Sequence, residues 1–200
     1  MKLWDILKLG LALMAYAAAA CVGLAFVYAG TAKTIEQRNR ADQEAALKEI
    51  FPGADGFEEI TGTIESSDPA VGFENEWAVR RNGVLVGAAL QAVGGSYGGP
   101  IKILVGVNAG GEIGRIKIME HSDTPGLGAN AADPSYYVNE ERKLSFADQF
   151  DGKPVSDPFE PKDDVIAISA ATITSRAVAV AVKAAGTAAE TWLAEQGAEQ

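Results

Sequence analysis

A short segment near the C-terminus combines small residues with hydroxyl groups. Residues 168–176 read Ile-Ser-Ala-Ala-Thr-Ile-Thr-Ser-Arg, so an apolar stretch passes through small side chains into an Ala-rich, helix-forming sequence. The first turn of a helix presents unpaired N–H groups and the positive end of the helix dipole, which favours a phosphate by about 0.3–1 kcal/mol. Thr172 and Thr174 place hydroxyl groups at this point, so the pattern is compatible with a phosphate site. The alternative interpretation is that the hydroxyls only cap the helix.

A second segment, from His121 to Gly128, reads His-Ser-Asp-Thr-Pro-Gly-Leu-Gly. A histidine beside carboxylates has the character of a general base, but no obvious nucleophile accompanies it. If His121 acts as a general base, the corresponding hypothesis is a hydrolase that uses Ser169 or Ser175 with His121. The alternative interpretation is a Pro-Gly turn with a partly exposed histidine.

Composition and charge exclude several other functions. The 200 residues include one cysteine and one histidine, so neither an intrachain disulfide, a Cys/His zinc cage nor a protein-ligated iron–sulfur cluster can form, and we expect no metal site. The net charge is −10: the first forty residues carry five basic and two acidic side chains, and the remainder carries 12 and 25. An acidic body repels polyphosphate backbones, so nucleic acid is not an expected partner.

The N-terminus contains 24 consecutive residues without a charge, Leu9 to Ala32. A helix of this length covers about 36 Å, against roughly 30 Å for the hydrocarbon core of a bilayer. We therefore predict a single-pass anchor in residues 1–32, with residues 9–32 in the lipid bilayer. Two alternatives are signal-peptidase cleavage at Val27-Tyr28-Ala29 and lipidation at Cys21, although the apolar run continues past both motifs.

The remaining chain is predicted to form a helical stalk, residues 33–53, and a domain, residues 54–200. Pro52-Gly53 ends the stalk helix. Asn82-Gly83, between strands 77–80 and 84–93, and residues 109–111, between strands 101–108 and 113–119, indicate two antiparallel hairpins. Residues 121–129 and 134–150 suggest loops and short helices, residues 151–164 an ordered connection, residues 165–168 a short strand, and residues 172–195 a helix. The predicted fold class is α+β, with hairpins packed against helices.

Taken together, these segments resemble the FMN-binding domain shared by the G subunit of Rnf-type ion-translocating ferredoxin:NAD oxidoreductases and the C subunit of sodium-translocating NADH:quinone reductase. The resemblance covers nearly the whole chain. The length of the chain favours the Rnf-type G subunit over the longer C subunit. The resemblance is carried by the N-terminal anchor and by the segments Tyr97–Ile101, Val105-Gly106, His121–Gly128, Phe150–Lys153 and Ser169–Ser175.

The resemblance implies FMN esterified through its phosphate to Thr172, the last residue of the family's Asp-x-x-Ser/Thr-Gly-Ala-Thr motif. A separate Mg-dependent flavin transferase would attach it from FAD. Thr172 is then a modified residue and not a nucleophile, and we expect no catalytic residue: the chain would be a redox-carrier subunit rather than a stand-alone enzyme. The other cofactor-binding residues implied are Ser169, Ala170, Ala171 and Thr174 in the attachment segment, and Tyr97, His121, Thr124, Leu127 and Gly128 near the flavin ring.

The chain departs from the family's pattern at three positions. Ile166 stands at the motif's Asp position, Ala170 at its Gly position, and Asp123 replaces the usual Glu before Thr-Pro-Gly. If the glycine position needs a positive φ, Ala170 adds strain of about 1 kcal/mol or more.

The resulting hypothesis is an electron-transfer subunit of an Rnf-like complex in the cell inner membrane, with other membrane subunits as partners. Its C-terminal domain would lie on the periplasmic, extracytoplasmic side, an orientation that rests on the resemblance because the charge count is ambiguous. The departures at Ile166 and Ala170 motivate the alternative hypothesis, a flavin-free assembly or scaffold subunit of the same kind of complex.

Overall fold

The computed structural model describes residues 3–161 and 163–198, and the chain divides into two compact units between Ala45 and Ala46. The first unit is formed by helix α1 (Leu3–Ile50) as far as Ala45. Its large apolar side chains are exposed, including Leu13 and Phe26 at 72% and 76%. Among the described residues, α1 is the helix that is long and apolar enough to cross a membrane.

The predicted anchor and stalk helices form one uninterrupted helix. Helix α1 ends at Ile50, just before Pro52, as predicted, because proline has no N–H for the helix ladder and restricts the residue before it. The second unit begins at Ala46, inside the segment that the sequence assigns to the stalk. In this unit Ala46, Leu47 and Ile50 are buried.

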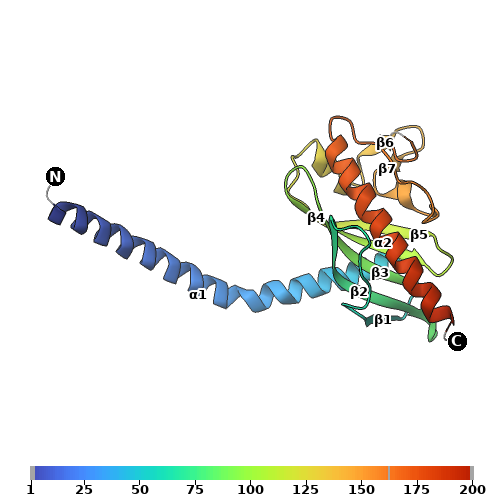
Figure 1. Ribbon diagram of the computed structural model, residues 1–200, viewed down its shortest axis with the longest axis horizontal. Coiled ribbons are helices and arrows are strands. Elements are labelled where there is room, and N and C mark those ends of the chain that lie inside the picture. The colour runs from blue at the N-terminus through green and yellow to red at the C-terminus, as the bar shows by residue number, and fades with distance from the viewer. Residues whose placement is uncertain (1–2, 162, 199–200) are drawn as a thin grey trace. The chain divides into compact units, whose positions relative to one another are not determined.

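The second unit contains a five-stranded antiparallel sheet whose strands follow one another in sequence order (Figure 1). The strands are β1 (Gly56–Glu59), β2 (Val71–Arg81), β3 (Val84–Gly95), β4 (Pro100–Asn108) and β5 (Ile113–Glu120). Both predicted hairpins are confirmed. Asn82 and Gly83 have φ angles of 52° and 80°, the positive values that a type I′ turn requires at both central positions. Strand β1 and the first half of β2 are not predicted from the sequence.

The two faces of the sheet bury different sets of side chains. In β4, Ile103, Val105 and Val107 alternate onto the face covered by helix α2 (Thr172–Ala198), which lies across the sheet in Figure 1. Leu104 points to the opposite face, where it packs in a cluster with the Phe51 ring. The sheet therefore has a helix on one face and the end of α1 on the other, which confirms the α+β class.

The connection from β5 to α2 contains only short elements: η1 (Gly128–Ala132), β6 (Tyr137–Asn139), β7 (Leu144–Ser145) and η2 (Asp148–Phe150). Three aromatic rings from this region join the core between the sheet and α2. The Phe150 ring lies edge-on to Phe146, with centroids 5.7 Å apart, and is stacked on Phe159 at 6.0 Å. All three side chains are buried, so the connection is ordered by packing.

The strand predicted over residues 165–168 is wrong. Apart from an isolated bridge between Val165 and Pro161, these residues pair with no strand. The Gln149 side chain takes the place of a neighbouring strand: its Oε1 accepts the Ile166 N–H at 2.7 Å, and its Nε2 donates to the Ile166 carbonyl at 3.2 Å. Because this side chain satisfies the backbone N–H and carbonyl of Ile166, that residue needs no neighbouring strand.

Candidate functional site

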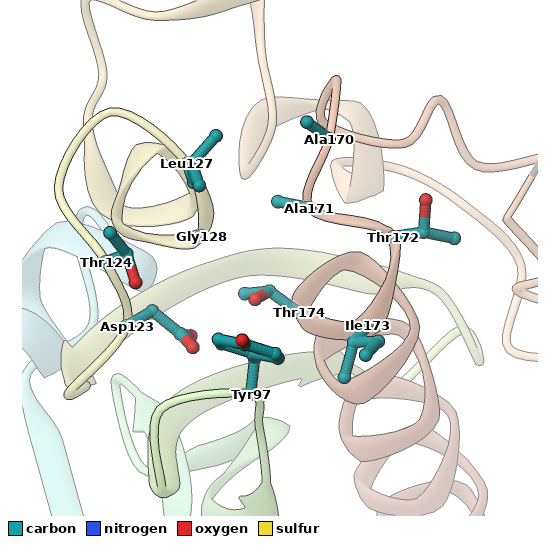
Figure 2. A pocket seen from close by; sticks show the side chains of 10 residues that line it. All are labelled: Tyr97, Asp123, Thr124, Leu127, Gly128, Ala170, Ala171, Thr172, Ile173 and Thr174. Carbon is teal, nitrogen blue, oxygen red and sulfur yellow. The ribbon is translucent and has the colours of Figure 1, made fainter.

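A pocket of about 460 Å³ lies where three segments, distant in sequence, come together (Figure 2). They are the turn between β3 and β4, the loop after β5, and the start of α2. The volume falls in the range of roughly 300–1,000 Å³ that is usual for small-molecule sites. The lining residues are Tyr97, Asp123, Thr124, Leu127, Gly128, Ala170, Ala171, Thr172, Ile173 and Thr174.

The start of α2 is fixed by a tight turn. The N–H of Ala171 donates to the Ile168 carbonyl at 3.1 Å, and Ala170, the third residue of this turn, has a φ of 60°. The buried Ser175 hydroxyl accepts the Ile168 N–H at 2.9 Å and donates to the Ala171 carbonyl at 3.0 Å. These bonds occupy the Ser175 hydroxyl, so the hydrolase hypothesis has no free nucleophile at this position.

The N-terminus of α2 has no side-chain cap. A helix leaves its first N–H groups without intrahelical partners, and Ala171, which precedes the first helical residue, has no side-chain oxygen to accept them. Thr172 is exposed, and its hydroxyl has no hydrogen-bond partner among the residues that the structure describes. The first turn therefore presents free N–H groups and a free hydroxyl together, next to the pocket.

The floor of the pocket depends on the absence of a side chain at Gly128. A Cβ atom built there would lie 2.5 Å from the Thr174 Oγ1 and 2.8 Å from the Asp123 Cβ. The buried Thr174 and Asp123 side chains therefore both occupy the space that a side chain at Gly128 would need. Only glycine allows the loop after β5 to lie this close to α2.

The rim of the pocket is apolar and exposed. Tyr97, Ile173 and Leu127 are 71%, 59% and 41% exposed, and they come from the three different segments. Single exposed apolar side chains are common on protein surfaces, but several around one pocket indicate contact with a ligand. Such a rim suits a flat aromatic group better than a sugar or a free ion.

Thr172 also lines two adjoining hollows. One, of about 530 Å³, contains Arg176, which lies one helical turn further along α2 and is exposed. The other, of about 440 Å³, contains Ser169 and Asp163. An anionic group on Thr172 would therefore have the helix N-terminus beneath it and a cationic side chain on one side.

Most of the site residues implied by the resemblance come together in the pocket. Those that line it are Tyr97, Thr124, Leu127, Gly128, Ala170, Ala171, Thr172 and Thr174. Ser169 lines the adjoining hollow with Thr172, and His121 is not among the lining residues of the pocket. The sequence did not identify Asp123 or Ile173 as site residues, although Asp123 directly precedes Thr-Pro-Gly and Ile173 directly follows Thr172.

The pocket lies within residues 96–187, which match the FMN-binding domain family. The second unit accordingly contains an FMN-binding domain. Residues 1–50 match a separate family, the RnfG N-terminal region.

Relatives resemble the chain along most of its length. The G subunit of the Na(+)-translocating ferredoxin:NAD(+) oxidoreductase complex of Acetobacterium woodii is 31% identical over 192 residues, covering 88% of this chain and 87% of that protein. The G subunit of the ion-translocating oxidoreductase complex of Methanosarcina acetivorans is 32% identical over 186 residues, covering 90% and 93%. The chain belongs to the family of G subunits of Rnf-type ion-translocating oxidoreductase complexes, which confirms the resemblance, and it is a membrane-bound protein.

Proposed function

We propose that this chain carries electrons within a membrane-bound oxidoreductase complex through FMN attached to Thr172 by a phosphoester bond. The observation that carries the proposal is the free, exposed hydroxyl of Thr172 at the uncapped N-terminus of α2, on the edge of the pocket. The relatives are named as subunits of oxidoreductase complexes, which supports a redox role and other subunits of such a complex as partners.

The neighbouring hydroxyl groups are less suited to attachment. Thr174 and Ser175 are 1% and 0% exposed, so a modifying enzyme cannot reach them without opening the helix. Ser169 is exposed but lies inside the turn that precedes α2, where it is not part of the first helical turn that supports a phosphate. Thr172 combines access with the favourable electrostatics of the helix end.

The residues of the pocket fit FMN. Ala170 and Ala171 leave room for a phosphate beside the backbone, the free N–H groups of α2 can donate to it, and Arg176 is close enough in sequence to add a positive charge. The exposed Tyr97 ring and the aliphatic groups of the rim can cover an isoalloxazine ring. When bound, FMN supplies the electron uptake and release at that ring, remote from its phosphate.

Attachment from FAD balances without another reactant. The Thr172 oxygen forms a bond to the phosphorus of the FMN half, the pyrophosphate P–O bond breaks, and AMP leaves as the hydroxyl proton is lost. The transferase supplies the Mg²⁺ and the active site for this step. The domain itself then has only to present the hydroxyl and bind the product.

Coexpression of the full chain with a flavin transferase tests the attachment. On a denaturing gel we expect ultraviolet fluorescence from the wild type and an intact mass raised by one FMN less one water. Thr172→Ala should be dark, whereas Thr191→Ala, which removes a hydroxyl from an exposed position on the same helix, should remain fluorescent. A dark wild-type band of unmodified mass would refute the covalent carrier.

The alternative function is a flavin-free assembly subunit, favoured by Ile166 and Ala170 in the attachment motif. A double variant, Ile166→Asp with Ala170→Gly, restores the motif. Fluorescence in the double variant but not in the wild type would show that the natural chain is the assembly subunit. Equal labelling of the wild type and the double variant would show that Ile166 and Ala170 do not prevent flavin attachment.

The extracytoplasmic position of the domain is also part of the proposal. It can be tested by fusing reporters that are active on only one side of the membrane to the C-terminus of the full chain. We expect activity from the extracytoplasmic reporter alone. Activity of a cytoplasmic reporter would overturn the orientation.

A further inference from the structure

Tyr97 contributes an aromatic ring to the pocket, yet its own packing does little to hold that ring in place. The side chain is 71% exposed and lies in the turn between β3 and β4. A ring in such a position would ordinarily move with its loop, because few contacts oppose the motion. What fixes Tyr97 must therefore act on the backbone on either side of it.

One carboxylate holds both neighbours of Tyr97. The Asp123 Oδ2 accepts a hydrogen bond from the Ser96 hydroxyl at 2.6 Å, and its Oδ1 accepts the Gly98 N–H at 2.8 Å. Asp123 is 6% exposed and forms no ion pair with the described residues, so these bonds to neutral donors compensate for its burial.

Two further features tighten the same turn. The Ser96 N–H donates to the Gly99 carbonyl at 2.8 Å. At Gly98 a Cβ atom would lie 2.2 Å from the Ser122 carbonyl oxygen, so the turn backbone lies directly against the loop that contains Asp123. The turn is thus attached to this loop at several points, and the exposed ring is left only its side-chain torsions.

We propose that Asp123 is a positioning residue, which fixes the Tyr97 ring at the mouth of the pocket so that it forms one wall of the flavin-ring site. This inference rests on the proposed function for the flavin. In Figure 2 the Asp123 and Tyr97 side chains lie next to each other on the side of the pocket opposite Ala170. Asp123 acts through Tyr97, and it is not proposed to take part in electron transfer.

The first experiment needs no flavin. Hydrogen exchange of the Gly98 amide is measured in the full-length chain, in the wild type and in Asp123→Ala. Loss of a hydrogen bond to a charged acceptor should speed exchange by roughly 10- to 100-fold. Ser96→Ala, which removes one of the two bonds and leaves the carboxylate in place, should give a smaller increase and provides the test should the Asp123 variant not fold.

Asp133 provides a matched control. Its Oδ1 also accepts hydrogen bonds from a backbone N–H, at 2.8 Å, and a serine hydroxyl, at 2.6 Å, both of Ser135, but it is exposed and does not line the pocket. Asp133→Ala should leave Gly98 exchange unchanged. Equal exchange in Asp123→Ala and the wild type, or equal acceleration in both Asp variants, would overturn the proposal.

The second experiment uses the covalently loaded protein and compares emission and visible circular dichroism per flavin. Asp123→Ala and Tyr97→Ala should change both signals in the same direction, and the double variant should match Tyr97→Ala alone, because Asp123 acts through Tyr97. Additive changes would overturn the coupling. A dark wild type would refute the flavin proposal instead and would leave the exchange result standing, so the two failures are distinguishable.

Discussion

Replacing Ala170 with glycine should stabilise the second unit. Ala170 has a φ of 60° at the third position of the turn closed by the Ala171 N–H and the Ile168 carbonyl. A turn with positive φ at this position alone favours glycine, because a Cβ atom crowds the backbone in the left-handed region. The Ala170 side chain is exposed, so its methyl group contributes little buried apolar area that the substitution would lose.

The size of the effect follows from two opposing terms. The left-handed conformation costs an alanine about 1–2 kcal/mol. Glycine gains conformational entropy in the unfolded chain, which offsets about 0.4–1 kcal/mol of this. The central values of these two ranges, about 1.5 and 0.7 kcal/mol, leave a net gain of about 0.8 kcal/mol, equivalent to a rise in Tm of roughly 2–3 °C for a unit of this size.

Urea unfolding of the full chain in detergent measures the change, with Trp77, 8% exposed, as a fluorescent reporter in the sheet. We expect a higher midpoint with an unchanged m value. Ala109→Gly is the matched control: Ala109 is an exposed turn residue without a positive φ, so glycine there should be neutral or slightly destabilising. An unchanged or lower midpoint for Ala170→Gly, or an equal gain in the control, would refute the strain at this turn.

Two further predictions concern the pocket floor and the response to acid. Gly128→Ala should lower the free energy of unfolding by about 1–3 kcal/mol and reduce the amount of covalent flavin, because the added Cβ has no room beside Thr174. Gly110 has open space around it, so Gly110→Ala should change neither quantity. Urea unfolding and the fluorescence gel measure the two effects. Burial alone would raise the pKa of Asp164, but the Lys153 ammonium at 3.0 Å and two backbone N–H groups hold that pKa below its usual range. The stability from this carboxylate is present above the unfolded pKa of about 3.9 and is lost as the pH falls through the lower folded value. Asp164→Asn should therefore lower Tm at pH 7 and flatten its decline between about pH 5 and pH 2, and an unaltered pH profile would contradict this account.

Much of the fold could be predicted because its signals are local. Asn82-Gly83 specifies a tight hairpin, Pro52-Gly53 ends one helix, and the small residues before Thr172 indicate the start of another helix. The wrongly predicted strand has a cause that is not local. The segment at residues 165–168 has the composition of a strand, but the side chain of Gln149, 17 residues earlier in the chain, forms the hydrogen bonds to the Ile166 backbone. No periodicity in the sequence indicates that a distant side chain forms these bonds.

The candidate site divides in the same way. The sequence by itself predicted the candidate membrane span, the Thr172 hydroxyl as the proposed attachment point, and the strain at Ala170 if its position required a positive φ. Only the tertiary structure showed that the φ of Ala170 is positive. It also showed that Asp123 accepts a hydrogen bond from Ser96, 27 residues earlier in the chain, and that Gly128 lies against Thr174. Helix starts and hairpin turns follow from neighbouring residues, whereas contacts between distant loops depend on how the sheet and α2 bring them together.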